Sequence, residues 1–117
     1  SLQTRDCESL ADAVLATTTP VIFEGEERAG FQRLERSVKL TRYGGDCYLY
    51  GMLAMGYVDL ATDATLKPYD IQGLIPIIEG AGGVVSTYAG ENPSLGGTVL
   101  AAGSKRLHEV ALRVIAG

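Results

Sequence analysis

Apolar and polar positions along the chain change period several times, and each change predicts a different element. Residues 12–18 (DAVLATT) are a short apolar run of small and β-branched side chains, which predicts a buried strand. Residues 26–40 place Phe31, Leu34 and Val38 near helical spacing among charged residues, which predicts an amphipathic helix. The chain therefore begins with a strand followed by a helix.

The rest of the chain repeats this alternation. The further expected elements are an extended piece at 41–45, a buried helix at 46–56, a strand at 57–63, a helix at 70–82, strands at 83–88 and 97–103, and an amphipathic helix at 105–116. Pro76 is expected to bend the helix at 70–82 or to shorten one of its ends. Alternating strands and helices predict an α/β fold, with a mostly parallel sheet flanked by helices, in one domain spanning 1–117.

Composition and charge narrow the classes of partner. The chain has 117 residues, 46% of them hydrophobic and 21% charged, which is ordinary for a globular domain. A formal net charge of −4 argues against nucleic acid or an anionic membrane surface as a partner. No apolar run approaches the roughly 20 residues of a membrane span. Cys7 and Cys47 are far apart in the sequence and in no CxxC pair, so a reducing, cytoplasmic setting is expected.

Two aspartates fall where an α/β sheet usually binds its ligands. Asp63 ends the strand expected at 57–63, and Asp70 follows seven residues later at the start of the next helix. Ligands of open α/β sheets bind outside the carboxyl ends of the strands. Carboxylate oxygens there suit Mg²⁺, although Asp70 at a helix start is equally explained as a helix cap. Spacing alone leaves these two interpretations of Asp70 balanced.

A second candidate site is the turn before the helix expected at 46–56. Gly44 and Gly45 permit a positive φ or a close approach to the backbone, and Asp46 then occupies the N-cap position. One interpretation is an ordinary strand-to-helix turn. The other is a loop along which a ligand lies, where the Asp46 carboxylate would favour a cationic or hydroxylated group.

Three other features are expected to be structural. Residues 25–27 (GEE) place carboxylates at a helix N-terminus, where they complement the helix dipole. Residues 80–83 (GAGG) follow a helix and are expected to form its C-cap and a turn. His108 lies between charged neighbours and is expected on the solvated surface, and no Ser/His/Asp or Cys/His arrangement supports a nucleophilic triad.

The segment from Asp70 onward carries a specific resemblance. PYD (68–70), an apolar helix and AGGVVS (81–86) resemble the carboxy-terminal signature of the inositol monophosphatase family, whose usual form is Trp-Asp, an apolar helix and Glu-Ala-Gly-Gly. Here Tyr69 replaces the Trp, and Gly80 stands in place of the Glu. Residues 42–60 and 13–20 resemble the histidinol-phosphate phosphatase branch in particular. The resemblance covers the whole chain, but only about the second half of a complete family member.

The resemblance implies a layered α/β/α/β/α sandwich and Mg²⁺-dependent hydrolysis of phosphate monoesters. By position, Asp70 matches the carboxy-terminal metal-binding aspartate, and Asp63 matches the acidic residue that hydrogen-bonds the polar body of the substrate. Gly44, Gly45 and Asp46 match the substrate-side loop. The inositol branch typically has a small apolar residue at the position of Asp46, so an aspartate there fits a substrate with an ammonium group, such as histidinol phosphate.

The resemblance also shows what this chain lacks. The family's other metal ligands include an Asp-x-x-Asp-Gly-Thr motif, which is absent from the sequence. The chain is thus expected to supply one Mg²⁺ ligand and to need the missing amino-terminal half, and family members commonly form homodimers. Alternatives are an inositol, sugar or nucleotide phosphatase, a non-catalytic small-molecule binding module, or a structural domain. Arg42 is left without an assigned role.

Overall fold

The structure is a computed structural model. It describes residues 3–5, 7, 9–17, 23–44, 48–66, 68–93 and 97–117. The described elements are a 3₁₀ turn (Leu10–Asp12), β1 (Val14–Thr17), α1 (Gly25–Ser37), β2 (Leu40–Tyr43), α2 (Tyr48–Ala54), β3 (Leu60–Leu66), α3 (Pro68–Gly80), β4 (Val84–Ser86), β5 (Gly97–Ala102) and α4 (Lys105–Ala116). Every helix and strand expected from the pattern is therefore present, with ends that shift by a few residues.

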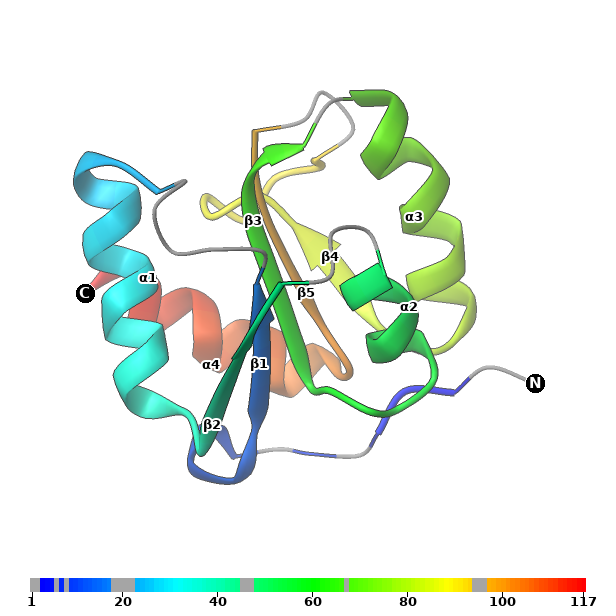
Figure 1. Cartoon of the computed structure of the whole chain (residues 1–117), viewed down its shortest axis with the longest axis horizontal. Coiled ribbons are helices and arrows are strands. Elements are labelled where there is room, and N and C mark those ends of the chain that lie inside the picture. The colour runs from blue at the N-terminus through cyan, green and yellow to red at the C-terminus, as the bar shows by residue number, and fades with distance from the viewer. Residues whose placement is uncertain are drawn as a thin grey trace.

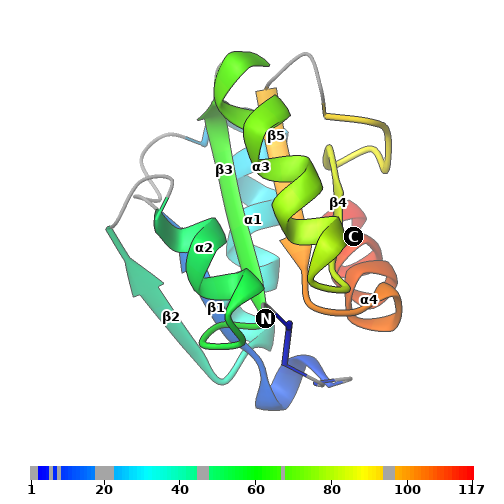
Figure 2. The same ribbon diagram turned by 90° about the vertical axis from the view of Figure 1, so that its right-hand side faces the viewer.

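Five strands form one sheet in the order β2-β1-β3-β5-β4. Helices α1 and α4 cover one face of the sheet, and α2 and α3 cover the other (Figures 1 and 2). The expected α/β class, with helices flanking a sheet, is confirmed.

The strand directions correct the expectation of a mostly parallel sheet. β1 is parallel to both β2 and β3, but β5 is antiparallel to both β3 and β4. The sheet is therefore mixed. The reason is that β4 is followed directly by β5, with no helix in the described residues between them, so the chain turns back beside the strand it has left.

Each face of the sheet has its own apolar core, because successive side chains of a strand point to opposite faces. The core under α1 and α4 includes Leu15, Phe23, Phe31, Leu34, Leu60, Leu100, Leu107 and Ile115. The core under α2 and α3 includes Ala16, Tyr50, Leu53, Val58, Ala61, Ile71, Ile78 and Val99. Alternating residues of β1 and β3 thus belong to opposite cores, which fixes the face on which each polar residue of these strands lies.

Helix α3 shows how its sequence sets both ends. Pro68 is its first residue, a position that needs no backbone N–H donor, and Pro76 lies inside the helix without ending it. The helix ends at Gly80, and the N–H groups of Gly82 and Gly83 return to the carbonyls of Glu79 (3.0 Å) and Ile78 (2.9 Å). Gly82 has a φ of +100°, which completes this Schellman-type cap and confirms the expected turn.

The amino-terminal segment is joined to the sheet by a buried carboxylate. Asp59, which precedes β3 and is fully buried, accepts hydrogen bonds from Arg5 Nε (2.8 Å) and Arg5 Nη2 (2.6 Å). The backbone N–H of Val14, the first residue of β1, donates to the same carboxylate at 2.7 Å. Asp59 therefore holds together the segment before β1, β1 itself and the entry to β3.

Candidate functional site

Asp63 is a buried carboxylate in β3. Only 3% of its surface is exposed, and the hydroxyl of Tyr50, a fully buried residue of α2, donates to Asp63 Oδ2 at 3.5 Å. Asp63 shares its face of the strand with Ala61, in the core under α2 and α3. It is paired with Val99 of β5, and the register of the two strands shifts between Asp63 and Leu66. Such irregularities often re-aim side chains beside active sites.

Asp70 lies in the first turn of α3, close in sequence to the end of β3. The helix starts at Pro68, so Asp70 is inside the first turn and not at the capping position before it. Its side chain is outside the described part of the structure. Ile71, the next residue, is fully buried in the core under α2 and α3, which anchors this first turn against the sheet. The backbone thus places Asp70 on the same side of the sheet as Asp63.

Of the glycine-aspartate turn, only Gly44 is described. Its φ is +91°, and its N–H donates to the carbonyl of Thr17 at 2.9 Å. A Cβ at this position would meet nothing within 4 Å, so the backbone angle and not a close contact accounts for the glycine. Gly45 and Asp46 lie outside the described residues, and their assignments stay predictions. Helix α2 is described from Tyr48.

Two of the described candidate residues, Gly44 and Asp63, lie toward the same edge of the sheet. Because β1, β2 and β3 are parallel, their carboxyl ends meet there. The bond between Gly44 and Thr17 joins the ends of β2 and β1, and Thr17 is in register with Thr62 of β3. Thr17 is fully buried, and among the described residues its Oγ1 is a buried side-chain atom without a hydrogen-bond partner.

Tyr88 and Thr62 form a polar contact that the sequence did not reveal. The Tyr88 hydroxyl lies 2.6 Å from Thr62 Oγ1, on the face of β3 opposite to Asp63. Burial raises the pKa of the Tyr88 hydroxyl, and the charges of Glu27 and Asp63 add to the rise.

His108 corrects an expectation. It is only 7% exposed, and its Nε2 lies 2.7 Å from Ser86 Oγ, so it is not a solvated surface residue. The Ser86 hydroxyl donates to the carbonyl of Thr87 at 2.7 Å, which leaves Nε2 to act as the donor to Ser86. Burial lowers the pKa of His108, and Glu109 opposes that shift. A histidine that donates to the serine does not activate it as a nucleophile.

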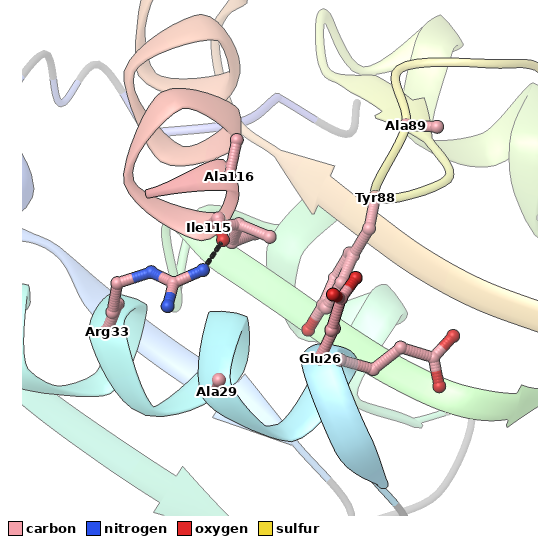
Figure 3. Close-up of a pocket in the computed structure, with 8 residues that line it drawn as sticks. Glu26, Ala29, Arg33, Tyr88, Ala89, Ile115 and Ala116 are labelled. Carbon is pink, nitrogen blue, oxygen red and sulfur yellow. Dashed lines mark hydrogen bonds between the residues drawn. The ribbon is translucent and has the colours of Figure 1, made fainter.

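The helices of the other face border a cavity of about 450 Å³ between α1 and α4 (Figure 3). Glu26 lines it from the first turn of α1, which confirms that the GEE segment begins a helix. Arg33 donates to the carbonyls of Val114 (3.0 Å) and Ile115, and so caps the last turn of α4. Tyr88 also lines this cavity, whereas Asp63 and Gly44 do not.

The described residues contain no metal-binding cluster and no membrane-spanning helix. Across these residues, no three or more His, Cys, Asp or Glu side chains form a group that could hold a metal ion. Cys7, which is buried, is a free thiol. Within the same part of the chain, every helix is too short or too polar to cross a membrane. The carboxylate of Asp70 is an oxygen donor of the type that Mg²⁺ prefers.

The fold and this edge define an α/β protein with carboxylates beside the carboxyl ends of its parallel strands. The model of the inositol monophosphatase family matches residues 1–116, and the chain belongs to that family. An inositol monophosphatase from Zymomonas mobilis has a similar structure, with a TM-score of 0.93 and 41% sequence identity over 99% of this chain. The expected family is thereby confirmed, whereas no particular branch of it is singled out.

Curated relatives are similar along much of the chain. The bifunctional phosphatase IMPL2, chloroplastic, of Arabidopsis thaliana is 39% identical over 120 residues, which cover 95% of this chain and 35% of the plant protein. The histidinol-phosphatase of Chlorobaculum parvum is 30% identical over 90 residues, 77% of this chain and 35% of that protein. The Zymomonas structure is covered to 47%. The chain thus spans between about a third and a half of the length of these relatives.

Proposed function

We propose that this chain is the substrate-side part of a Mg²⁺-dependent phosphate monoesterase. The observation that carries this proposal is the arrangement around β3. Asp63 is buried in the strand beside Tyr50, and Asp70 follows in the first turn of α3 on the same side of the sheet. Together with membership in a family of phosphatases, this arrangement supports a site that binds a hydroxylated phosphate ester at this edge.

Asp63 and Asp70 have different tasks in this proposal. Asp63 accepts hydrogen bonds from the hydroxyl groups of the substrate, because a buried carboxylate makes strong, directional bonds to such donors. Asp70 contributes one oxygen to Mg²⁺, a cation that takes few protein carboxylates and keeps several waters. When bound, Mg²⁺ would neutralise charge on the phosphoryl oxygens. The remaining ligands would come from residues outside this chain, in line with the short span that the chain covers in its relatives.

We propose histidinol phosphate as the substrate. The proposal rests on Asp46, whose carboxylate would attract the ammonium group of this compound, and on the similarity to proteins named histidinol-phosphatase. Asp63 would then orient the rest of the molecule. In this proposal the protein acts in the cytoplasm.

An inositol phosphate, or a related sugar or nucleotide phosphate, is the second candidate substrate. The specific observation in its favour is the similarity to the Zymomonas inositol monophosphatase, at 41% identity and a TM-score of 0.93. Asp63 serves this substrate as well, because the ring of inositol carries many hydroxyl groups. The two candidates differ at Asp46, which only an amine-bearing substrate uses as a counter-charge.

A panel of phosphate monoesters tests both proposals on the protein in the longest form that its gene encodes. We expect Mg²⁺-dependent release of phosphate that Asp70→Asn abolishes without unfolding the protein, while Asp12→Asn, a change at an exposed position, leaves the activity unchanged. Asp46→Ala should raise KM for histidinol phosphate and leave KM for inositol phosphate unchanged. Full activity of Asp70→Asn would refute the metal-ligand role, and no release from any ester would refute the proposed reaction.

We also propose that the working protein contains the region equivalent to the amino-terminal half of its relatives and that it forms a homodimer. The first part is supported by the coverage of 35% of IMPL2 and 47% of the Zymomonas protein. Light scattering of the complete protein would report its mass, and a monomeric mass would refute the dimer.

A further inference from the structure

The end of β3 needs to be held in place, because its pairing is irregular immediately after Asp63. Residues Leu60 to Asp63 are in continuous register with β5, but the register shifts between Asp63 and Leu66. A shift of this kind bends the strand and increases its twist. The direction of the Asp63 carboxylate therefore depends on what anchors β3 at the last regular pairs.

Thr62, the neighbour of Asp63, is anchored on the opposite face. Its Oγ1 donates to the carbonyl of Val99 in β5 (2.8 Å) and lies 2.6 Å from the Tyr88 hydroxyl. The Thr62 hydroxyl has one proton, which is used on Val99, so Tyr88 is the donor to Thr62. The backbone N–H of Tyr88 also donates to Thr98 Oγ1 at 3.2 Å. Tyr88 thus bridges β3 and β5 at the final pairs before the register shift.

The ring of Tyr88 has a fixed position of its own. It stacks on Phe23 with a centroid separation of 5.8 Å and an interplanar angle of 7°, and Phe23 stacks on Phe31 of α1 at 4.7 Å. Phe23 and Phe31 are both buried, with exposed fractions of 0% and 1%. Offset stacks of this kind restrict the ring at little cost in side-chain entropy. The hydroxyl of Tyr88 is therefore presented to Thr62 by a rigid aromatic column.

We propose that Tyr88 is a positioning residue: by its hydrogen bond to Thr62, it holds the neighbouring Asp63 carboxylate in the orientation that binds the substrate. The proposal rests on the proposed function of Asp63. β3 is clamped from both faces at adjacent residues, by Tyr50 at Asp63 and by Tyr88 at Thr62. Loss of the Tyr88 hydroxyl removes the contact on one face of β3 only. The fold is therefore retained, but the orientation of the Asp63 carboxylate is less well fixed.

Tyr88→Phe is the test variant, because it removes one hydroxyl and keeps the stacked ring. Thr62 Oγ1 retains its bond to Val99, so the variant leaves no buried donor unpaired there. Tyr57→Phe is the matched control, since Tyr57 is 66% exposed and precedes the same strand. In the complete protein, we expect Tyr88→Phe to raise KM roughly threefold to tenfold with kcat changed less than about twofold, because Asp63 contributes to binding the substrate and not to the chemical step.

A double-mutant cycle with Asp63→Asn separates positioning from a purely structural role. If Tyr88 acts through Asp63, then adding Tyr88→Phe to Asp63→Asn should change KM by less than about 1.5-fold. Thermal unfolding of all four proteins is measured alongside, because a structural role lowers Tm and leaves KM unchanged. KM effects that multiply, or an unchanged KM in Tyr88→Phe, would overturn the proposal.

The cycle also distinguishes this proposal from the proposed function. If the wild-type protein hydrolyses a phosphate ester and Asp63→Asn raises KM, the function of Asp63 holds whatever Tyr88→Phe does. If Asp63→Asn leaves KM unchanged, the role of Asp63 is refuted, and the role of Tyr88 is refuted with it.

Discussion

Replacement of Asp59 by alanine should strongly destabilise the protein. Asp59 has no exposed surface, and its carboxylate accepts three hydrogen bonds, from Arg5 Nε, Arg5 Nη2 and the Val14 N–H. Asp59→Ala removes both acceptor oxygens and with them all three hydrogen bonds. The change therefore acts on the junction of the amino-terminal segment with the start of β1.

The magnitude follows from what each donor does after the change. The Val14 N–H would be left without its acceptor, and an unpaired buried donor costs about 1 to 3 kcal/mol. The side chain of Arg5 is 45% exposed and can return to water, so the loss of its ion pair adds only about 1 kcal/mol. We therefore expect Asp59→Ala to lower the free energy of unfolding by about 2 to 4 kcal/mol. Arg5→Ala should lower it by a comparable amount, because it leaves the fully buried Asp59 carboxylate without its counter-charge.

Urea unfolding followed by circular dichroism measures both values. Asp59→Asn should cost less than either change, because the neutral amide needs no counter-charge and its oxygen can still accept from Val14. Asp12→Ala, at an exposed position, is the control and should change the free energy by less than about 0.5 kcal/mol. The reasoning fails if Asp59→Ala or Arg5→Ala costs no more than Asp12→Ala, or if Asp59→Asn costs more than Asp59→Ala.

Three further outcomes are expected. The pKa of His108 is lower in the folded protein than in the unfolded chain, so unfolding takes up a proton when the pH falls below about 6.5. The free energy of unfolding should therefore fall from pH 7.5 to pH 5.5, and it should fall less steeply in His108→Gln. Denaturation at each pH measures both slopes. Gly83→Ala should lower Tm, because the added Cβ would lie 2.8 Å from both the Ala102 carbonyl oxygen and Ile78 Cγ2. Gly73→Ala should raise Tm, because a Cβ at this position in α3 meets open space. Equal shifts in the two variants would contradict this steric argument. The 117-residue chain alone should release no more phosphate from histidinol phosphate with Mg²⁺ than its Asp70→Asn variant does, and robust turnover would refute the need for ligands outside it.

The helices and strands could be predicted because their signals are local. The apolar positions of α1 and α4 recur at helical spacing, and the start and end of α3 are marked by Pro68 and by Gly82. The direction of β5 could not be predicted in this way, because it depends on pairing with β3 and β4. His108 was misplaced because the charged Arg106 and Glu109 lie close to it in the sequence, whereas Ala111 and Ile115, one and two turns further on, are buried on the same face of α4.

Single residues of the candidate site could be predicted from the sequence, but the contacts between them could not. Asp63 and Asp70 were singled out from their places at the end of a predicted strand and at a helix start, and the family resemblance gave each an expected role. The strand was predicted too short, because β3 continues past Asp63 to Leu66. The contacts of Tyr50 with Asp63 and of Tyr88 with Thr62 join residues 13 and 26 positions apart. Nothing in the local sequence marks such pairs, because they exist only once the strands and helices have packed.

The position of β5 has a consequence for the protein during its synthesis on the ribosome. This strand, Gly97–Ala102, is the last of the five described strands along the chain, yet it lies between β3 and β4 and pairs with both. Until β5 leaves the ribosome, β3 and β4 have no common partner, and the backbone groups of β3 that pair with β5 are open to other chains. A nascent chain that stalls before Gly97 would therefore be prone to aggregate, and this sheet can be completed only after β5 has been made.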